Sequence, residues 1–190
     1  MSKKKLVILA SGAGSNARNI INYFGRGDLA EIVLIASNKH NAGVLDIAAE
    51  FGIETYLLDK NNLTHSNEFL DKLRSVNPDL IVLAGFLLKV PENIVDAFPN
   101  KIVNIHPALL PKYGGKGMYG HFVHEAVYAA GEKESGITIH FVNCNYDEGD
   151  IIFQQRVSLT NGDTPASIEA KVRALEIECF PAQIELLLKR

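Results

Sequence analysis

The sequence has no excess of basic residues, which argues against a nucleic-acid partner. Its 19 lysines and arginines stand against 22 aspartates and glutamates, for a formal net charge of −3. Nucleic-acid-binding domains usually carry a basic excess or a basic stripe. The only dense basic run, Lys3-Lys4-Lys5, is short enough to be a solvated lead-in to a strand. We therefore expect no nucleic acid among the partners.

The sequence also lacks long apolar runs and paired cysteines. No apolar run approaches the roughly 20 residues of a membrane-spanning helix. The run at 6–10 is too short for a secretory signal. Cys144 and Cys179 form no CxxC motif, so a disulfide scaffold is not expected. These features predict no membrane partner and a reducing, cytoplasmic location.

Repeats, linkers and low-complexity segments are absent as well. A chain of 190 residues fits one domain better than two, and it is long enough to bury a sizeable core. We therefore expect a single domain over residues 1–190, present as a monomer or a homodimer.

What the sequence does have is an alternation of short apolar runs with segments of helical periodicity. Between the first two runs, for example, apolar residues recur at i, i+3, i+4 and i+7, from Ala17 to Phe24. The alternation predicts an α/β fold, an open, mostly parallel, twisted sheet of about seven strands with helices on both faces, as in Rossmann-like proteins. The first five expected strands are residues 5–10, 32–37, 54–58, 80–85 and 102–106.

The pattern changes after the fifth expected strand, where an antiparallel addition is predicted. The expected elements are a loop rich in glycine and proline at 107–120, a helix at 121–130 and strands at 137–141 and 151–157. The domain therefore divides into a phosphate-binding, Rossmann-like half at 1–100 and a catalytic half at 101–190.

A long amphipathic helix is expected at the C-terminus. Thr164 can cap it, and Pro165 suits its first turn. Pro181 is expected to kink or break it, because proline has no N–H and its ring clashes with the preceding turn. One face of this helix is apolar, with Ile168, Val172, Leu175 and Cys179.

A glycine-containing loop, residues 11–17, joins the first strand to the first helix. Glycines let the backbone approach a ligand closely, and the free N–H groups at a helix start attract a phosphate. The spacing of Gly12, Gly14 and Ala17 formally fits a dinucleotide fingerprint, but Ser37-Asn38-Lys39 supplies no carboxylate for a ribose. The loop therefore favours a phosphate-bearing ligand over a dinucleotide, and over a tight turn without a ligand.

Asn104 and His106 stand at the end of a predicted strand and, as residues i and i+2, project from the same face. Ligands of open α/β sheets bind beyond the carboxyl ends of the strands. An amide donor beside a titratable imidazole suits acyl transfer, in which oxygen charge is stabilised and a proton moves. A lone histidine is more often structural, but the asparagine partner and the strand-end position favour the catalytic interpretation.

Asp147 has two interpretations that spacing does not separate. A carboxylate could set the charge and the orientation of His106. An aspartate in a loop could equally bond its own backbone in a turn.

Other candidate sites are weaker. His121 and His124 are three residues apart on a predicted helix, but no third ligand stands at a persuasive spacing. We therefore expect no metal. Cys144 has no dedicated activating base, and Ser15 does not stand in a GxSxG elbow.

Taken together, these segments resemble the phosphoribosylglycinamide formyltransferases, the folate-dependent enzymes of purine synthesis, over almost the whole chain. The motifs are specific in combination. They are Ser11-Gly12-Ala13-Gly14-Ser15-Asn16, Ser37-Asn38, Leu83-Ala84-Gly85-Phe86, the run from Asn104 to Tyr113, Ile139-His140-Phe141-Val142 and Asp147-Glu148-Gly149.

The resemblance implies two small-molecule substrates. Gly14, Ser15 and Asn16 would hold the phosphate of glycinamide ribonucleotide, and Glu176 would contact the same substrate. The formyl donor would be 10-formyltetrahydrofolate, bound without a metal. Its pocket would include Asn104 and be lined by Leu87, Leu88, Lys89 and Val90.

The resemblance also implies a mechanism. Asn104 and His106 would stabilise the oxygen of the tetrahedral intermediate, with His106 acting as proton donor. Asp147 would raise the pKa of His106. The substrate amine would attack the formyl carbon directly, so no enzyme nucleophile is needed.

Several rivals remain. Formyltetrahydrofolate deformylases, methionyl-tRNA formyltransferases and sugar N-formyltransferases share the catalytic residues. The first two usually carry an additional domain, for which this chain has no room. A rival of another class is a non-catalytic, nucleotide-binding Rossmann module, which would have no need of His106 or Asp147.

Overall fold

The computed structural model describes residues 2–190 and shows seven strands and seven helices there. The strands are β1 (Lys4–Leu9), β2 (Ala30–Ser37), β3 (Thr55–Leu57), β4 (Leu80–Leu83), β5 (Ile102–His106), β6 (Glu134–Phe141) and β7 (Ile151–Ser158). The helices are α1 (Ser15–Phe24), α2 (Gly43–Glu50), α3 (Lys60–His65), α4 (Glu68–Val76), α5 (Glu92–Ala97), α6 (His121–Ala129) and α7 (Pro165–Leu188).

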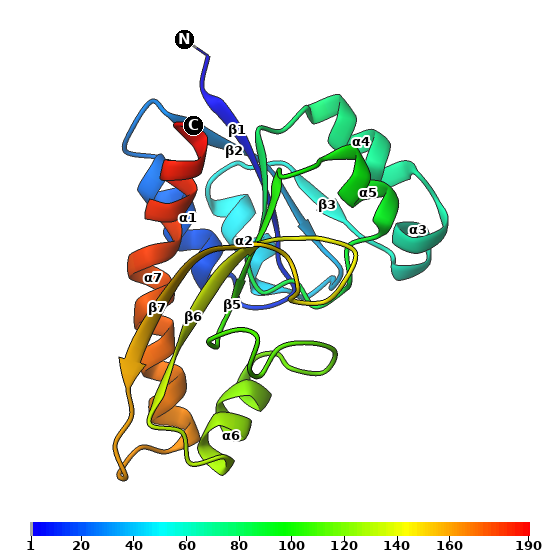
Figure 1. The fold of residues 1–190 in the computed structure, drawn as a ribbon. Coiled ribbons are helices and arrows are strands. Elements are labelled where there is room, and N and C mark those ends of the chain that lie inside the picture. Colours follow the sequence, from blue (N-terminus) through cyan, green and yellow to red (C-terminus); the bar gives the residue numbers. More distant parts are fainter. Residues whose placement is uncertain (1) are drawn as a thin grey trace.

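The seven strands form one sheet in the order β3-β2-β1-β4-β5-β6-β7 (Figure 1). The first five strands in this order are parallel, whereas β6 runs antiparallel to β5 and β7 antiparallel to β6. The predicted mostly parallel sheet with an antiparallel addition is therefore confirmed. All four residues of β4 are buried, as expected for a strand covered on both faces.

Two apolar cores lie on opposite faces of the sheet. In β1, Leu6 and Ile8 belong to one core and Val7 and Leu9 to the other, because successive side chains of a strand point to opposite faces. The first core is covered by α1, α2, α6 and α7, and the second by α3, α4 and α5 (Figure 1).

The strand order reverses at β1, which lies between β2 and β4. At such a point the loops after neighbouring strands diverge and leave a crevice at the carboxyl ends of the strands. The loops after β1 and β4 stay tied at their start, because Ser11 N donates to Gly85 O at 3.0 Å. This arrangement brings the glycine loop and the end of β5 to the same edge of the sheet.

The helix α7 differs from the expectation at Pro181, because it continues without a break to Leu188. Phe180 and Ile184, on either side of the proline, are fully buried in the core. The proline leaves the Ile177 carbonyl without its usual helical donor, and Asn19 Nδ2 of α1 donates to that carbonyl at 2.7 Å. Tertiary contacts thus compensate for the proline. In the described part of the chain, 2–190, no helix has the length and apolar character of a membrane span.

Candidate active site

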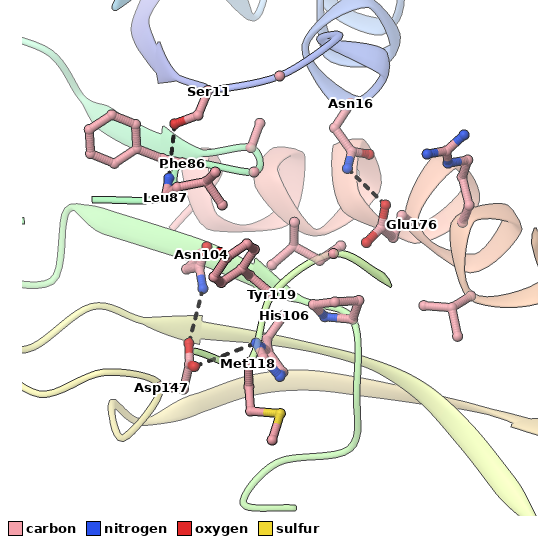
Figure 2. Close-up of a pocket in the computed structure, with 18 of the residues that line it drawn as sticks. Ser11, Asn16, Phe86, Leu87, Asn104, His106, Met118, Tyr119, Asp147 and Glu176 are labelled. Carbon is pink, nitrogen blue, oxygen red and sulfur yellow. Dashed lines mark hydrogen bonds and ion pairs between the residues drawn. The ribbon is translucent and has the colours of Figure 1, made fainter. Parts of the chain in front are cut away.

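A cavity of about 630 Å³ opens at the carboxyl ends of β1, β4 and β5 (Figure 2). The glycine loop forms one wall, the end of β5 the floor, and the loop before α6 another wall. Helix α7 closes the side near the glycine loop through four lining residues one turn apart, Glu169, Val172, Arg173 and Glu176. Residues from both halves of the chain therefore meet in one cavity.

The glycine loop has the geometry of an anion site. Gly14 has a φ of 82°, and a Cβ built on it would lie 2.8 Å from the Ile47 side chain and 2.9 Å from Val44, so only glycine fits. Gly14 is the N-cap of α1, and no side chain caps this helix. The first N–H groups of α1, including those of Ser15 and Asn16, are therefore free to bind a negatively charged group.

Glu176 faces the glycine loop from α7. Its Oε2 accepts a hydrogen bond from Asn16 Nδ2 at 2.9 Å (Figure 2). Burial raises the pKa of Glu176 above its ordinary value, although the hydrogen bond from Asn16 and the charge of Arg173 oppose this. The resemblance led to Glu176 and not to Arg173, which lines the same wall.

His106 lies at the end of β5 with only 3% of its surface exposed. Its Nε2 is 2.7 Å from the carbonyl oxygen of Tyr113, and its Nδ1 is 3.5 Å from Asp147 Oδ2. Because a carbonyl only accepts hydrogen bonds, Nε2 carries a proton. The imidazole therefore donates to a carbonyl through Nε2 and faces a carboxylate at Nδ1.

Asp147 is presented by a strained loop position with a φ of 56°. Its Oδ2 accepts a hydrogen bond from Gly115 N at 2.9 Å, so it does not cap a turn of its own loop. Burial pushes the pKa of Asp147 up, but the nearby His140 imidazole, the charge of His106 and the Gly115 N–H together hold it below its ordinary value. Asp147 is thus a carboxylate, and the structure favours the orienting interpretation over the turn.

Burial lowers the pKa of His106 and His140 adds to this effect, whereas Asp147 and the Tyr113 carbonyl raise it. Asp147 acts in the expected direction, but burial is larger, and the pKa lies below the ordinary value. His106 is thus neutral at rest. A negative charge that develops nearby would favour its protonated form.

His140 is a site residue that the residue-by-residue analysis did not single out. Its Nε2 is 3.1 Å from Asn104 Nδ2, and its Nδ1 is 2.8 Å from the Phe141 carbonyl. Nδ1 donates to that carbonyl, and Nε2 lies between Asn104 Nδ2 and Asp147 Oδ1, which is 3.6 Å away. Asn104 pairs with His140 across β5 and β6. The strand register was needed to identify this partner of Asn104.

The residues expected to bind the formyl donor divide into two groups. Leu87 lines the cavity, and its backbone N donates to Ser11 Oγ at 2.9 Å. Leu88, Lys89 and Val90 are not among the lining residues. Val90 is 5% exposed and packs in the core, while Lys89 Nζ lies 6.0 Å from the ring centre of Tyr146. Their contact with the donor stays a prediction.

The two histidines considered as metal ligands separate in the structure. His121 is exposed, whereas His124 is buried and lines the cavity. Residues 2–190 contain no group of three or more His, Cys, Asp or Glu side chains that could hold a metal ion.

A crevice at the switch point of an open α/β sheet, with an amide, an imidazole and a carboxylate at its floor, has the features of an enzyme active site that moves a proton and stabilises charge on oxygen. Residues 4–184 match the formyl transferase family, and the chain belongs to this family. The fold and the family that the sequence motifs indicated are therefore confirmed.

Known relatives place the chain more closely. It is 37% identical to the phosphoribosylglycinamide formyltransferase of Haemophilus influenzae, over 96% of this chain and 86% of that protein. It is 42% identical to the chloroplastic phosphoribosylglycinamide formyltransferase of Arabidopsis thaliana, over 90% of this chain. The chain spans 60% of that relative and 61% of its Vigna unguiculata counterpart. The phosphoribosylglycinamide formyltransferase structure of Bacillus halodurans superimposes with a TM-score of 0.89 at 33% identity, over 98% of this chain and 96% of that one.

Proposed function

We propose that this chain transfers the formyl group of 10-formyltetrahydrofolate to the amine of 5-phosphoribosylglycinamide in de novo purine synthesis. One observation carries the proposal. The free N–H groups at the start of α1 and the set Asn104, His106 and Asp147 line the same cavity. A phosphate-bearing acceptor anchored at the first place would have its reactive end at the second.

The acceptor binds between α1 and α7. The N–H groups of Ser15 and Asn16 hold its phosphate, and Gly14 allows the backbone to approach closely. The cation at this wall is Arg173, whose side chain is 56% exposed and pairs with Glu169 at 3.3 Å. It would turn from Glu169 toward the phosphate. Glu176 keeps one carboxylate oxygen free, because Oε2 is the atom that takes the Asn16 hydrogen bond. That second oxygen can accept from a ribose hydroxyl.

The reaction follows from the geometry at the floor of the cavity. The acceptor amine forms a bond to the formyl carbon, and the carbonyl oxygen takes up negative charge. Asn104 Nδ2–H and His106 Nε2–H stabilise this oxygen. The bond to N10 of the folate then breaks. One proton passes from the attacking nitrogen to N10 by way of His106, so the imidazole ends in the protonation state in which it began.

Asp147 and Tyr113 control His106 in this scheme. Asp147 faces Nδ1 at 3.5 Å, so it fixes the ring and stabilises its protonated form. The Tyr113 carbonyl accepts from Nε2 at 2.7 Å. The substrate oxygen replaces this carbonyl as the acceptor of the Nε2 proton.

The formyl donor occupies the side of the cavity that is remote from α7. This side is apolar and aromatic, with Phe86, Leu87 and Tyr146 among its lining residues, and suits a flat ring system. Leu88, Lys89 and Val90 continue the same segment and complete the proposed donor pocket.

A direct assay tests the proposal. Purified protein with both substrates should release the deformylated folate and formylated glycinamide ribonucleotide. His106→Ala and Asp147→Asn should each remove nearly all transfer, because acid–base catalysis and one donor each contribute about 100-fold or more. Circular dichroism should show both variants folded. Product formation without the ribonucleotide would identify a hydrolase, and near wild-type turnover in either variant would contradict the mechanism.

A further inference from the structure

His124 is a buried histidine of the cavity that the proposed mechanism does not use. It lies on α6, is 3% exposed and lines the cavity. Its Nδ1 is shielded from solvent and has no hydrogen-bond partner among residues 2–190. The other ring nitrogen, Nε2, is then the polar atom through which this side chain can reach the cavity.

A histidine kept in a core for structural reasons is normally hydrogen-bonded, because an unpaired buried polar group costs stability. His124 does not meet that expectation at Nδ1. An N–H at Nδ1 would lack an acceptor, so the neutral ring carries its proton on Nε2. The ring therefore offers the cavity one hydrogen-bond donor.

The position of His124 follows from the packing of α6 against α7. The charges of Glu169 and Arg173 on α7 both act on His124. One turn further along α7, Glu176 accepts the hydrogen bond from Asn16 at the start of α1. Seven residues of helix separate Glu169 from Glu176, which is about 10 Å. A ligand anchored at the start of α1 can therefore be within reach of Arg173 and His124.

The charged groups around His124 keep it neutral before a ligand binds. Burial lowers its pKa, and Arg173, His106 and His121 add to this, while Glu169 opposes it. A neutral imidazole donates a hydrogen bond without adding a second charge beside Arg173, which already pairs with Glu169 at 3.3 Å.

We propose that His124 is a substrate-binding residue that donates from Nε2 to the phosphate of the acceptor, opposite the N–H groups of Ser15 and Asn16. The inference rests on the proposed function in one respect, because that function makes the acceptor a phosphate ester. His124 and Arg173 form the α6–α7 side of the phosphate subsite, and α1 forms the other.

Binding measurements without catalysis test the subsite. Calorimetry with ribose 5-phosphate as the probe compares the wild type with His124→Phe, which keeps the ring volume and removes the donor, and with His124→Gln, whose amide nitrogen can take the place of Nε2. The Phe variant should weaken binding about 10- to 100-fold, the range for a hydrogen bond to a charged group. The Gln variant should retain most of the affinity. His121→Gln, an exposed histidine on the same helix, is the matched control and should bind as the wild type does.

Kinetics supply a second readout. In His124→Phe the KM for glycinamide ribonucleotide should rise about 10-fold or more, while the KM for the folate should stay within about twofold. A melting curve establishes that the variant is folded. Unchanged ribose 5-phosphate affinity in a folded His124→Phe protein would overturn the proposal, and so would an equal rise in both KM values.

Phosphate binding by His124 and formyl transfer can fail separately. A wild type that binds ribose 5-phosphate through His124 but transfers no formyl group would retain the subsite and refute the reaction. A wild type that transfers the formyl group with no contribution from His124 would retain the reaction and refute the subsite.

Discussion

The carboxylate of Asp147 lies close to two imidazoles. Its Oδ2 lies 3.5 Å from His106 Nδ1 and its Oδ1 lies 3.6 Å from His140 Nε2. Asn104 Nδ2 also donates to Asp147 Oδ1 at 3.5 Å (Figure 2), so a single carboxylate connects the two groups that would stabilise the intermediate. An isolated histidine at this depth would be neutral because of burial alone. The carboxylate is what makes protonation of His106 accessible when negative charge develops.

The pKa of His106 should therefore depend on Asp147. In Asp147→Asn the larger of the two effects that raise this pKa is gone and burial remains, so the pKa should fall further below its ordinary value. An NMR titration of the His106 ring signals in the two proteins measures the shift. Asp150→Asn, an exposed change in the same loop, is the control. A pKa of His106 that is equal or higher in Asp147→Asn would refute the assigned role.

The ionised carboxylate of Glu176 reduces the stability of the folded protein. Its pKa is raised by burial, so the folded state favours the protonated form, and stability falls as pH rises through the raised pKa. Glu176→Gln should increase the free energy of unfolding at pH 7.5, because the neutral amide avoids the cost of holding a buried charge. The gain should vanish near pH 4, where the wild-type carboxyl is protonated. Urea unfolding at both pH values measures it, and a loss of stability at pH 7.5 would contradict the prediction.

The same variant should bind the acceptor more weakly, because an amide oxygen is a poorer acceptor for ribose hydroxyls than a carboxylate. A gain in stability with a loss in acceptor affinity is the pattern expected of a binding residue.

At the scale of elements, α1 and α7 depend on each other through the proline of α7. Pro181 has no N–H, so the Ile177 carbonyl is free to accept from Asn19. Asn19→Ala should cost about 1 kcal/mol, the usual net value of a hydrogen bond. In a Pro181→Ala background, the new N–H can donate to Ile177 within the helix, and Asn19→Ala should cost little. A double-mutant cycle by urea unfolding gives the coupling, and additive effects would contradict this account.

The elements that could be predicted from the sequence are those with a local signal. Residues 102–106 were expected to form a strand and do so as β5, because a short apolar run between turns is a local signal. The fourth strand was expected to reach Gly85 but ends at Leu83, since Gly85 turns the chain with a φ of 75°. The helices α3 and α5 have six residues each, fewer than two turns, so periodicity could not indicate them.

The same distinction between local signals and tertiary contacts applies to the residues of the site. Asn104 and His106 could be predicted because both stand at one strand end, and a period of two sets their common face. Asp147 and His140 needed the pairing of β5 with β6 and the folding of the loop after β6. His124 looks like an ordinary position on the buried face of a helix, and only its unpartnered nitrogen distinguishes it.

At the scale of the molecule, the two halves share one sheet and contribute to both apolar cores. β4 of the first half pairs with β5 of the second, and α7 packs against α1 at the far end of the sequence, where Tyr23 donates to Glu185. The expected division at residue 100 therefore does not coincide with a break in the sheet. That the whole chain is a single domain stays a prediction.

Thermal unfolding should accordingly show one transition, with equal calorimetric and van't Hoff enthalpies. A ligand that bridges α1, α6 and α7 should shift this transition as a whole. At 100 times its Kd, glycinamide ribonucleotide should add about 2.7 kcal/mol and raise the Tm by roughly 5–10 °C. Ribose at the same concentration is the control, because it lacks the phosphate. Two resolved transitions would show that the halves unfold independently. A ligand that shifts only part of the unfolding signal would contradict binding in the cavity between them.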